Sequence, residues 1–171
     1  GSGEQGIALA REGVGKLRGT GTDAAMSIAL AFLGVPLCLD GQTEEAVSLA
    51  EKSISLAEAG DNFGQLMAHR IMAMAAAQFD PPNWKKAATN IEQSIRLSEA
   101  RRARPDQAIG LYRYAEILHK KGDLDASRAQ LEQTTALFRD MEMTWWREQA
   151  EGLQARIERG EQFRGFAPYA G

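Results

Sequence analysis

The side chains best suited to metal binding or acid–base chemistry in this chain are its two histidines, His69 and His119, and the acid Glu116. A metal site needs several ligands close together, and Glu116 is the only acid well placed beside His119. His69 is 50 residues away from His119 in the sequence. Both histidines are therefore interpreted as ordinary, partly exposed residues. No metal site and no catalytic residue is predicted.

Patterns for nucleotide binding or nucleophilic catalysis are not found. The glycines within residues 13–19 do not open a helix after a strand, which a phosphate-binding loop requires. No arrangement of serine, histidine and aspartate suggests an activated nucleophile. The sequence thus predicts neither a cofactor nor an enzyme activity for this chain.

Two clusters could still bind a ligand. Arg101, Arg102 and Arg104 lie at a predicted helix end, where cations offset exposed carbonyls. The alternative is a patch that binds phosphate or acid. Trp145 and Trp146 could form a ligand platform, but the favoured interpretation places one ring under the last helices and the other at the rim.

Composition narrows the class of protein. The 171 residues are 44% hydrophobic and 25% charged, as in folded chains, and the net charge of −3 argues against nucleic-acid binding. The single cysteine, Cys38, lies in an apolar stretch and is expected to be a buried thiol in a reducing compartment. No membrane span or signal peptide is visible, so a cytoplasmic location is expected.

A repeat organises the whole chain. The four-residue segments 51–54, 92–95 and 132–135 are near-copies of one another at strides of 41 and 40 residues. Such a period is typical of solenoids, in which each unit stacks on the next because none can bury its apolar face alone. Apolar residues recur at helical spacing within each unit, and capping or turn residues interrupt that spacing near its middle and at its ends. This pattern predicts two helices in each unit.

The fold predicted from this repeat is all-α: a right-handed superhelical α-solenoid of antiparallel helix pairs with about eight helices. Residues 1–3 look like an expression scar, and residues 4–160 form a single array. Within it we expect an unpaired second helix at 4–19, complete units at 22–60, 61–103 and 104–140, a capping helix at 143–160, and a tail at 161–171 that folds back on the array or is disordered.

These units resemble the tetratricopeptide repeat, whose motif pairs W-x₂-L-G-x₂-Y with A-x₃-F. The small residues of the two motif halves are 12 positions apart in all three units. The first half appears as Leu30, Leu33, Gly34 and Leu37, as Ile71, Met74, Ala75 and Gln78, and as Leu111, Tyr114, Ala115 and Leu118; the second half appears as Ala46 and Ala50, Ala87 and Ile91, and Ser127 and Leu131.

The units depart from the family pattern in two ways. They are 40 to 41 residues long instead of the usual 34, and the closing proline is absent. This longer form resembles the arrays of large bacterial signalling proteins. Residues 138–146 also resemble, less specifically, the repeat segment of multidomain adenylate or guanylate cyclase-like signalling ATPases, although this chain has no cyclase or ATPase motif.

The resemblance implies a concave wall built by the first helix of each unit. By that alignment the wall comprises Ile28, Ala31, Val35 and Cys38, then His69, Met72, Ala76 and Phe79, then Ile109, Tyr112, Glu116 and His119, joined by Arg113 and Lys120. Partner-binding residues are expected where apolar and polar positions meet: His69, Met72, Phe79, Tyr112, Arg113, Glu116 and His119. The alternative is that these side chains are used up in the packing of each first helix against the first helix of the next unit.

The predicted function is a non-catalytic scaffold that binds a peptide or a neighbouring domain in the concave groove. The alternative is a regulatory segment of a larger bacterial signalling protein with upstream cyclase or ATPase domains. The expected partner is a protein, a peptide or another domain of the same chain, and neither nucleic acid nor a membrane. The unpaired helix at 4–19 is also expected to expose apolar surface through which copies could associate.

Overall fold

The computed structural model describes residues 2–19, 21–57 and 62–169, which form eight α-helices and no strand. The all-α solenoid of antiparallel helix pairs is confirmed. The boundary between the units expected at 22–60 and 61–103 lies outside the described residues. The helices are α1 (Ser2–Leu17), α2 (Asp23–Leu39), α3 (Thr43–Ala57), α4 (Asn62–Gln78), α5 (Trp84–Ala100), α6 (Arg104–Lys121), α7 (Leu124–Asp140) and α8 (Thr144–Glu158).

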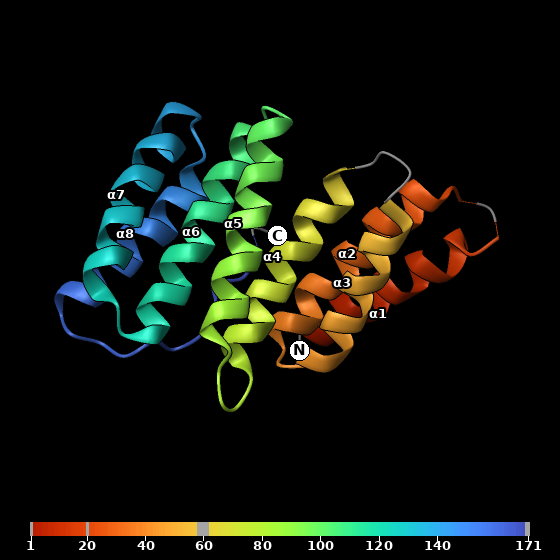
Figure 1. Cartoon of the computed structure of the whole chain (residues 1–171), viewed down its shortest axis with the longest axis horizontal. Coiled ribbons are helices and arrows are strands. Elements are labelled where there is room, and N and C mark those ends of the chain that lie inside the picture. The colour runs from red at the N-terminus through yellow and green to blue at the C-terminus, as the bar shows by residue number, and fades with distance from the viewer. Residues whose placement is uncertain (1, 20, 58–61, 170–171) are drawn as a thin grey trace.

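The helices stack in chain order along the long axis of the molecule (Figure 1). Each helix packs on its sequence neighbours, and the first helices α2, α4, α6 and α8 also contact one another in series. This second set of contacts makes a continuous wall of first helices. The surface along that wall is where the sequence placed the groove.

The small residues of the repeat lie where helices approach most closely. A Cβ atom at Gly34 would be 3.0 Å from Ile71 Cδ1 and 3.6 Å from the carbonyl oxygen of Ala46, so α2 meets both α3 and α4 there. The corresponding Ala75 and Ala115 are completely buried. Close approach at these positions lets the larger apolar residues interdigitate.

Hydroxyl groups hold the two helices of a pair together. Ser53 Oγ on α3 donates to the carbonyl oxygen of Ser27 on α2 at 2.8 Å, and Ser94 Oγ on α5 donates to that of Leu66 on α4 at 2.7 Å. These serines belong to the near-copied segments from which the repeat was found. The third copy has Thr134 at this position, and its buried hydroxyl has no partner among the described residues, so the hydrogen bond recurs in two of the three copies.

The helix α8 packs on the array through one apolar stripe. Its stripe of Trp146, Ala150, Leu153 and Ile157 is buried against α6 and α7. Trp145 is only partly buried, which agrees with one tryptophan under the array and the other at its rim.

More of the apolar surface of α1 is buried than the sequence suggested. α1 begins at Ser2 and buries Ile7 and Val14 in the core shared with α2. Leu9, which is 71% exposed, is its main uncovered apolar side chain among those described. Association through this helix remains a prediction. Among the described residues, no helix is long and apolar enough to cross a membrane.

Candidate functional site

The wall of first helices is not empty, because the chain lays its own C-terminal segment along it. Residues 161–169, which we call the tail, have no regular secondary structure and run back from the end of α8 toward α4 (Figure 1). The tail first meets α6 at His119, then at Glu116 and finally at Arg113. It is therefore antiparallel to α6.

The tail begins at the carboxyl end of α6. His119 Nε2 donates to the carbonyl oxygen of Glu161 at 2.9 Å. The ring of Phe163 stands edge-on to the His119 ring, with centroids 5.9 Å apart, and Lys120 Nζ lies 5.7 Å above the Phe163 ring. The first tail contacts thus combine one backbone hydrogen bond with one aromatic side chain.

In the middle of the tail, a buried carboxylate recognises the backbone. The amide of Ala167 donates to Glu116 Oε1 at 2.7 Å, and the Ala167 side chain is buried. Phe166 packs against apolar residues from two neighbouring units and lies 5.1 Å from the Phe163 ring. The groove therefore binds a main-chain N–H as well as side chains.

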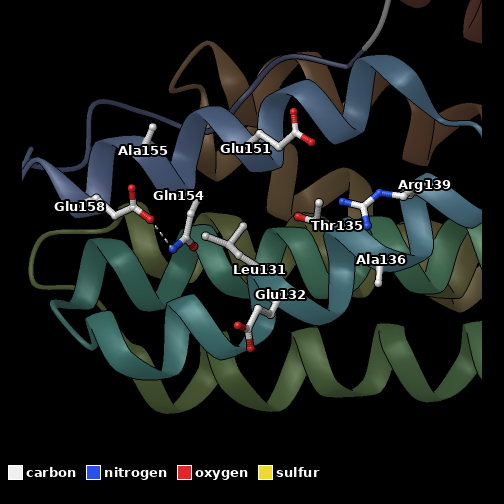
Figure 2. A pocket seen from close by; sticks show the side chains of 9 residues that line it. All are labelled: Leu131, Glu132, Thr135, Ala136, Arg139, Glu151, Gln154, Ala155 and Glu158. Atoms are coloured by element: carbon white, nitrogen blue, oxygen red, sulfur yellow. Dashed lines mark hydrogen bonds between the residues drawn. The ribbon is translucent and has the colours of Figure 1, made fainter.

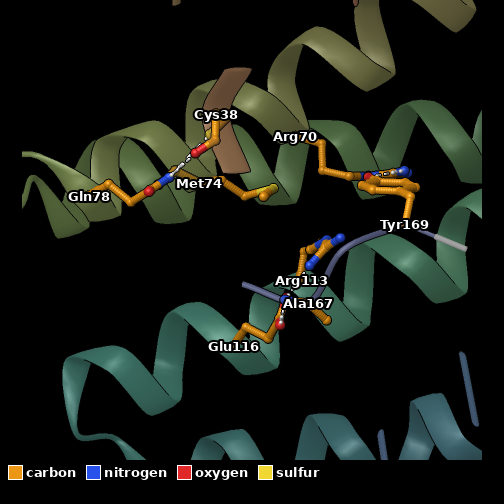
Figure 3. Close-up of polar contacts among 8 residues, drawn as sticks. All are labelled: Cys38, Arg70, Met74, Gln78, Arg113, Glu116, Ala167 and Tyr169. Atoms are coloured by element: carbon orange, nitrogen blue, oxygen red, sulfur yellow. Dashed lines mark hydrogen bonds and ion pairs between the residues drawn. The ribbon is translucent and has the colours of Figure 1, made fainter. Parts of the chain in front are cut away.

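At the far end of the tail, Tyr169 lies between two buried arginines, as Figure 3 shows. The Arg113 guanidinium carbon is 4.8 Å from the centre of the Tyr169 ring, and Arg70 Nη1 is 3.5 Å from its hydroxyl oxygen. The edge of the Trp146 ring faces the same tyrosine at a centroid distance of 5.2 Å. Cation–π and edge-to-face contacts of this kind each contribute about 0.5–2 kcal/mol.

The polar centre of the site is an ion pair with no exposure to water. Arg113 Nη1 and Glu116 Oε2 are 2.6 Å apart, and their side chains are 0% and 1% exposed. Burial raises the pKa of the Glu116 carboxyl, while Arg113 and the Ala167 amide oppose that rise. With one oxygen on Arg113 and the other on Ala167, Glu116 joins the tail to α6.

The two arginines nevertheless retain N–H groups without acceptors. Among the described residues, Arg113 Nε and Nη2 and Arg70 Nε are buried and have no hydrogen-bond partner. Arg70 uses its Nη2 on the carbonyl oxygen of Asp106 at 2.9 Å. Unpaired buried donors are costly, so the tail is an imperfect complement to this end of the groove.

The residues predicted from the sequence divide into two groups. Arg113, Glu116 and His119 lie together under the tail, and all three are buried. His69 instead turns toward α5, where its Nδ1 is 2.8 Å from Asn90 Oδ1. Met72 and Phe79 are partly buried against the apolar core of the first four helices.

Tyr112 does not open onto the groove as expected. Its side chain is completely buried, and its ring packs on Phe138 of α7 and Trp146 of α8 at centroid distances of 6.4 and 5.7 Å. The reason is that α8 closes the end of the array over this position. Tyr112 is therefore part of the core that supports Arg113, and its truncation would act first on folding.

Some site residues were missed by sequence reasoning. Arg70 and Trp146 were not assigned to the groove, and neither was any residue of the tail. The tail has no helical periodicity and therefore no register that could place it on the wall. The one available signal was the even spacing of Phe163, Phe166 and Tyr169 in a segment otherwise rich in small and polar residues.

A second hollow lies on another face, between α7 and α8 (Figure 2). This cleft of about 470 Å³ is the place that the second helix of a further unit would take. In the third unit, the first-helix motif residues are Leu111, Tyr114, Ala115 and Leu118. The residues one repeat of 40 positions later, on α8, are Glu151, Gln154, Ala155 and Glu158, so three of the four are polar. All four line the cleft. Carboxylates at packing positions suit a solvated end face.

No group of histidine, cysteine, aspartate and glutamate that could hold a metal ion is present among the described residues. Comparisons of the chain with protein-family models, with curated proteins and with solved structures gave no match.

Proposed function

We propose that this protein is a non-catalytic binding module of the tetratricopeptide type, whose wall of first helices takes up an extended protein segment. The observation that carries the proposal is the tail, an extended segment already bound along that wall. A preformed groove of this kind binds a peptide with little reorganisation of its own backbone.

The chemistry of the groove supports a peptide ligand. Glu116 accepts a hydrogen bond from a main-chain N–H, and His119 donates one to a main-chain carbonyl. These two contacts do not depend on the ligand's side chains, so they would serve any extended segment that follows the same path. The aromatic and cationic residues around them would provide selectivity.

A selection experiment tests this function. A library of random nine-residue peptides is displayed and selected on the full chain carrying Tyr169→Ala, which weakens the tail's hold on the groove. We expect selected peptides to bind with dissociation constants of micromolar order. Their binding should fall at least tenfold when Glu116→Gln or His119→Ala is added.

The matched controls lie on second helices. Glu132→Gln in the cleft between α7 and α8, and Arg128→Ala on the outer face of α7, should leave the binding of the same peptides unchanged. Peptides that respond to Glu132→Gln but not to the groove changes would contradict the proposal, as would a selection that enriches no binder.

A further inference from the structure

The side chains of the tail alternate in a regular way between groove and solvent. Phe163, Phe166 and Tyr169 are partly buried on the wall, whereas Gln162 and Pro168 between and beside them are exposed. The three rings are spaced three residues apart in the sequence, and all three lie on the wall. The tail therefore presents one aromatic face to the groove.

Each ring occupies its own place on the wall. Phe163 lies against His119 and Lys120, and Phe166 packs where neighbouring units meet. Tyr169 lies against Arg113 and Trp146. The groove thus has three aromatic subsites in series, and their spacing is set by the first helices.

The tail occupies these three subsites but leaves hydrogen-bond donors in the groove without acceptors. Among the described residues, three arginine nitrogens at the Tyr169 subsite have no acceptor, and the Tyr169 hydroxyl lies at the long distance of 3.5 Å from Arg70 Nη1. Backbone recognition of the tail is also sparse, since among the described residues only two main-chain groups of the tail bond to α6, the carbonyl of Glu161 and the amide of Ala167. The covalent link between the tail and α8 must therefore account for much of the tail's occupancy of the groove.

We infer that the tail is a built-in competitor for the binding site, and that the outside partner is an extended segment with aromatic side chains at three positions spaced three residues apart. This inference rests on the proposed function and adds the chemistry of the ligand. A tethered segment acts at an effective concentration of millimolar order, so a partner must displace it.

The test uses the full chain and a fluorescently labelled peptide with the sequence of residues 161–169. Binding is measured on the wild-type chain and on a variant whose tail carries Phe163→Ala, Phe166→Ala and Tyr169→Ala. We expect the peptide to bind the variant at least tenfold more tightly than the wild-type chain. A control chain with Gln162→Ala, which alters an exposed tail position, should behave like the wild type.

The peptide itself is varied in the same way. Replacing its three aromatic residues by alanine should reduce binding to the variant at least tenfold, whereas replacing its glutamine and proline should not. Equal binding of both peptides would overturn the aromatic requirement, and equal affinity for both chains would overturn the competition. Either result leaves the proposed function standing, because a peptide still binds the groove and responds to Glu116→Gln.

A second measurement is independent of the triple variant and of its folding. Hydrogen exchange at the Ala167 amide of the wild-type chain reports whether the tail is on Glu116. Saturating amounts of the unlabelled peptide should accelerate this exchange at least tenfold, and the alanine-substituted peptide should not. Unchanged exchange while the peptide demonstrably binds would show that it binds elsewhere, and the inference would be wrong.

Discussion

At the scale of single residues, Gly34 marks a close approach of two units. Because a Cβ atom there would be only 3.0 Å from Ile71 Cδ1, Gly34→Leu should destabilise the fold by about 1–3 kcal/mol through overpacking. Urea unfolding followed by circular dichroism measures the change. Gly152 on α8 has no atom near its hypothetical Cβ, so Gly152→Ala should instead stabilise by about 0.5–1 kcal/mol. The reverse order would refute the assigned repeat register.

The buried pair of Arg113 and Glu116 makes a second prediction. Glu116→Leu leaves a fully buried guanidinium without its acid, which typically costs about 3–5 kcal/mol. The double change Arg113→Met with Glu116→Leu removes both charges, and it should be less destabilising than Glu116→Leu alone. Denaturant unfolding of the wild type, of Glu116→Leu, of Arg113→Met and of the double variant provides the comparison. Additive effects of the two single changes would mean that the pair is not coupled.

Cys38 predicts how stability depends on alkaline pH. Burial raises the pKa of this thiol from 9.0 to about 12. Between these values the unfolded chain has lost a proton that the folded chain keeps, so stability falls by up to about 1.4 kcal/mol per pH unit. Cys38→Ala lacks this contribution. The difference in unfolding free energy between wild type and Cys38→Ala should therefore shrink as pH rises above 9, and a constant difference would contradict the buried thiol.

At the scale of helices, α8 depends on one side chain. The Trp146 ring contacts Tyr112, Phe138 and Tyr169 and is only 7% exposed. Trp146→Ala should therefore cost about 3–5 kcal/mol. Trp145→Ala, at the rim, should cost less than half as much. Both values follow from chemical denaturation, and similar losses for the two variants would exclude Trp146 as the main anchor of α8.

The helices were largely predictable from the sequence, because each follows from a local periodic pattern. The unit expected at 61–103 contains α4 and α5, and the helix expected at 143–160 is α8, Thr144–Glu158. The site was only partly predictable. Arg113, Glu116 and His119 were found from the wall's register, whereas Arg70 and the tail meet across 99 residues without any shared pattern.

The register of the second and third units also shows why helix position alone is an incomplete guide. His69 aligns with Ile109 of the next unit, yet it bonds to Asn90 on the second helix of its own pair. The available hydrogen-bond partner decided its direction. Repeat alignment predicts which helix a residue belongs to better than it predicts which neighbour its side chain contacts.

At the scale of the whole molecule, the tail links three first helices that do not follow one another directly in the chain. It touches α4 at Arg70, α6 at Glu116 and α8 at Trp146. Removing residues 161–171 should therefore speed hydrogen exchange in α6 and α8, and leave α2 and α3 unchanged, because solenoid units communicate mainly with their neighbours. Mass spectrometry of peptide fragments measures both regions. Uniform acceleration along the chain would show that the tail stabilises the array as a whole.

The same contact has a consequence for the order of folding. Most packing in this chain joins consecutive helices, so its contact order is low and its helices can assemble quickly. The contact between Arg70 and Tyr169 instead closes a loop of 99 residues, and it needs α4, α6 and α8 already in place. Tail docking should therefore be the last kinetic step of refolding. In pulse-labelling experiments, the Ala167 amide should gain protection only after the amides of the helices have done so.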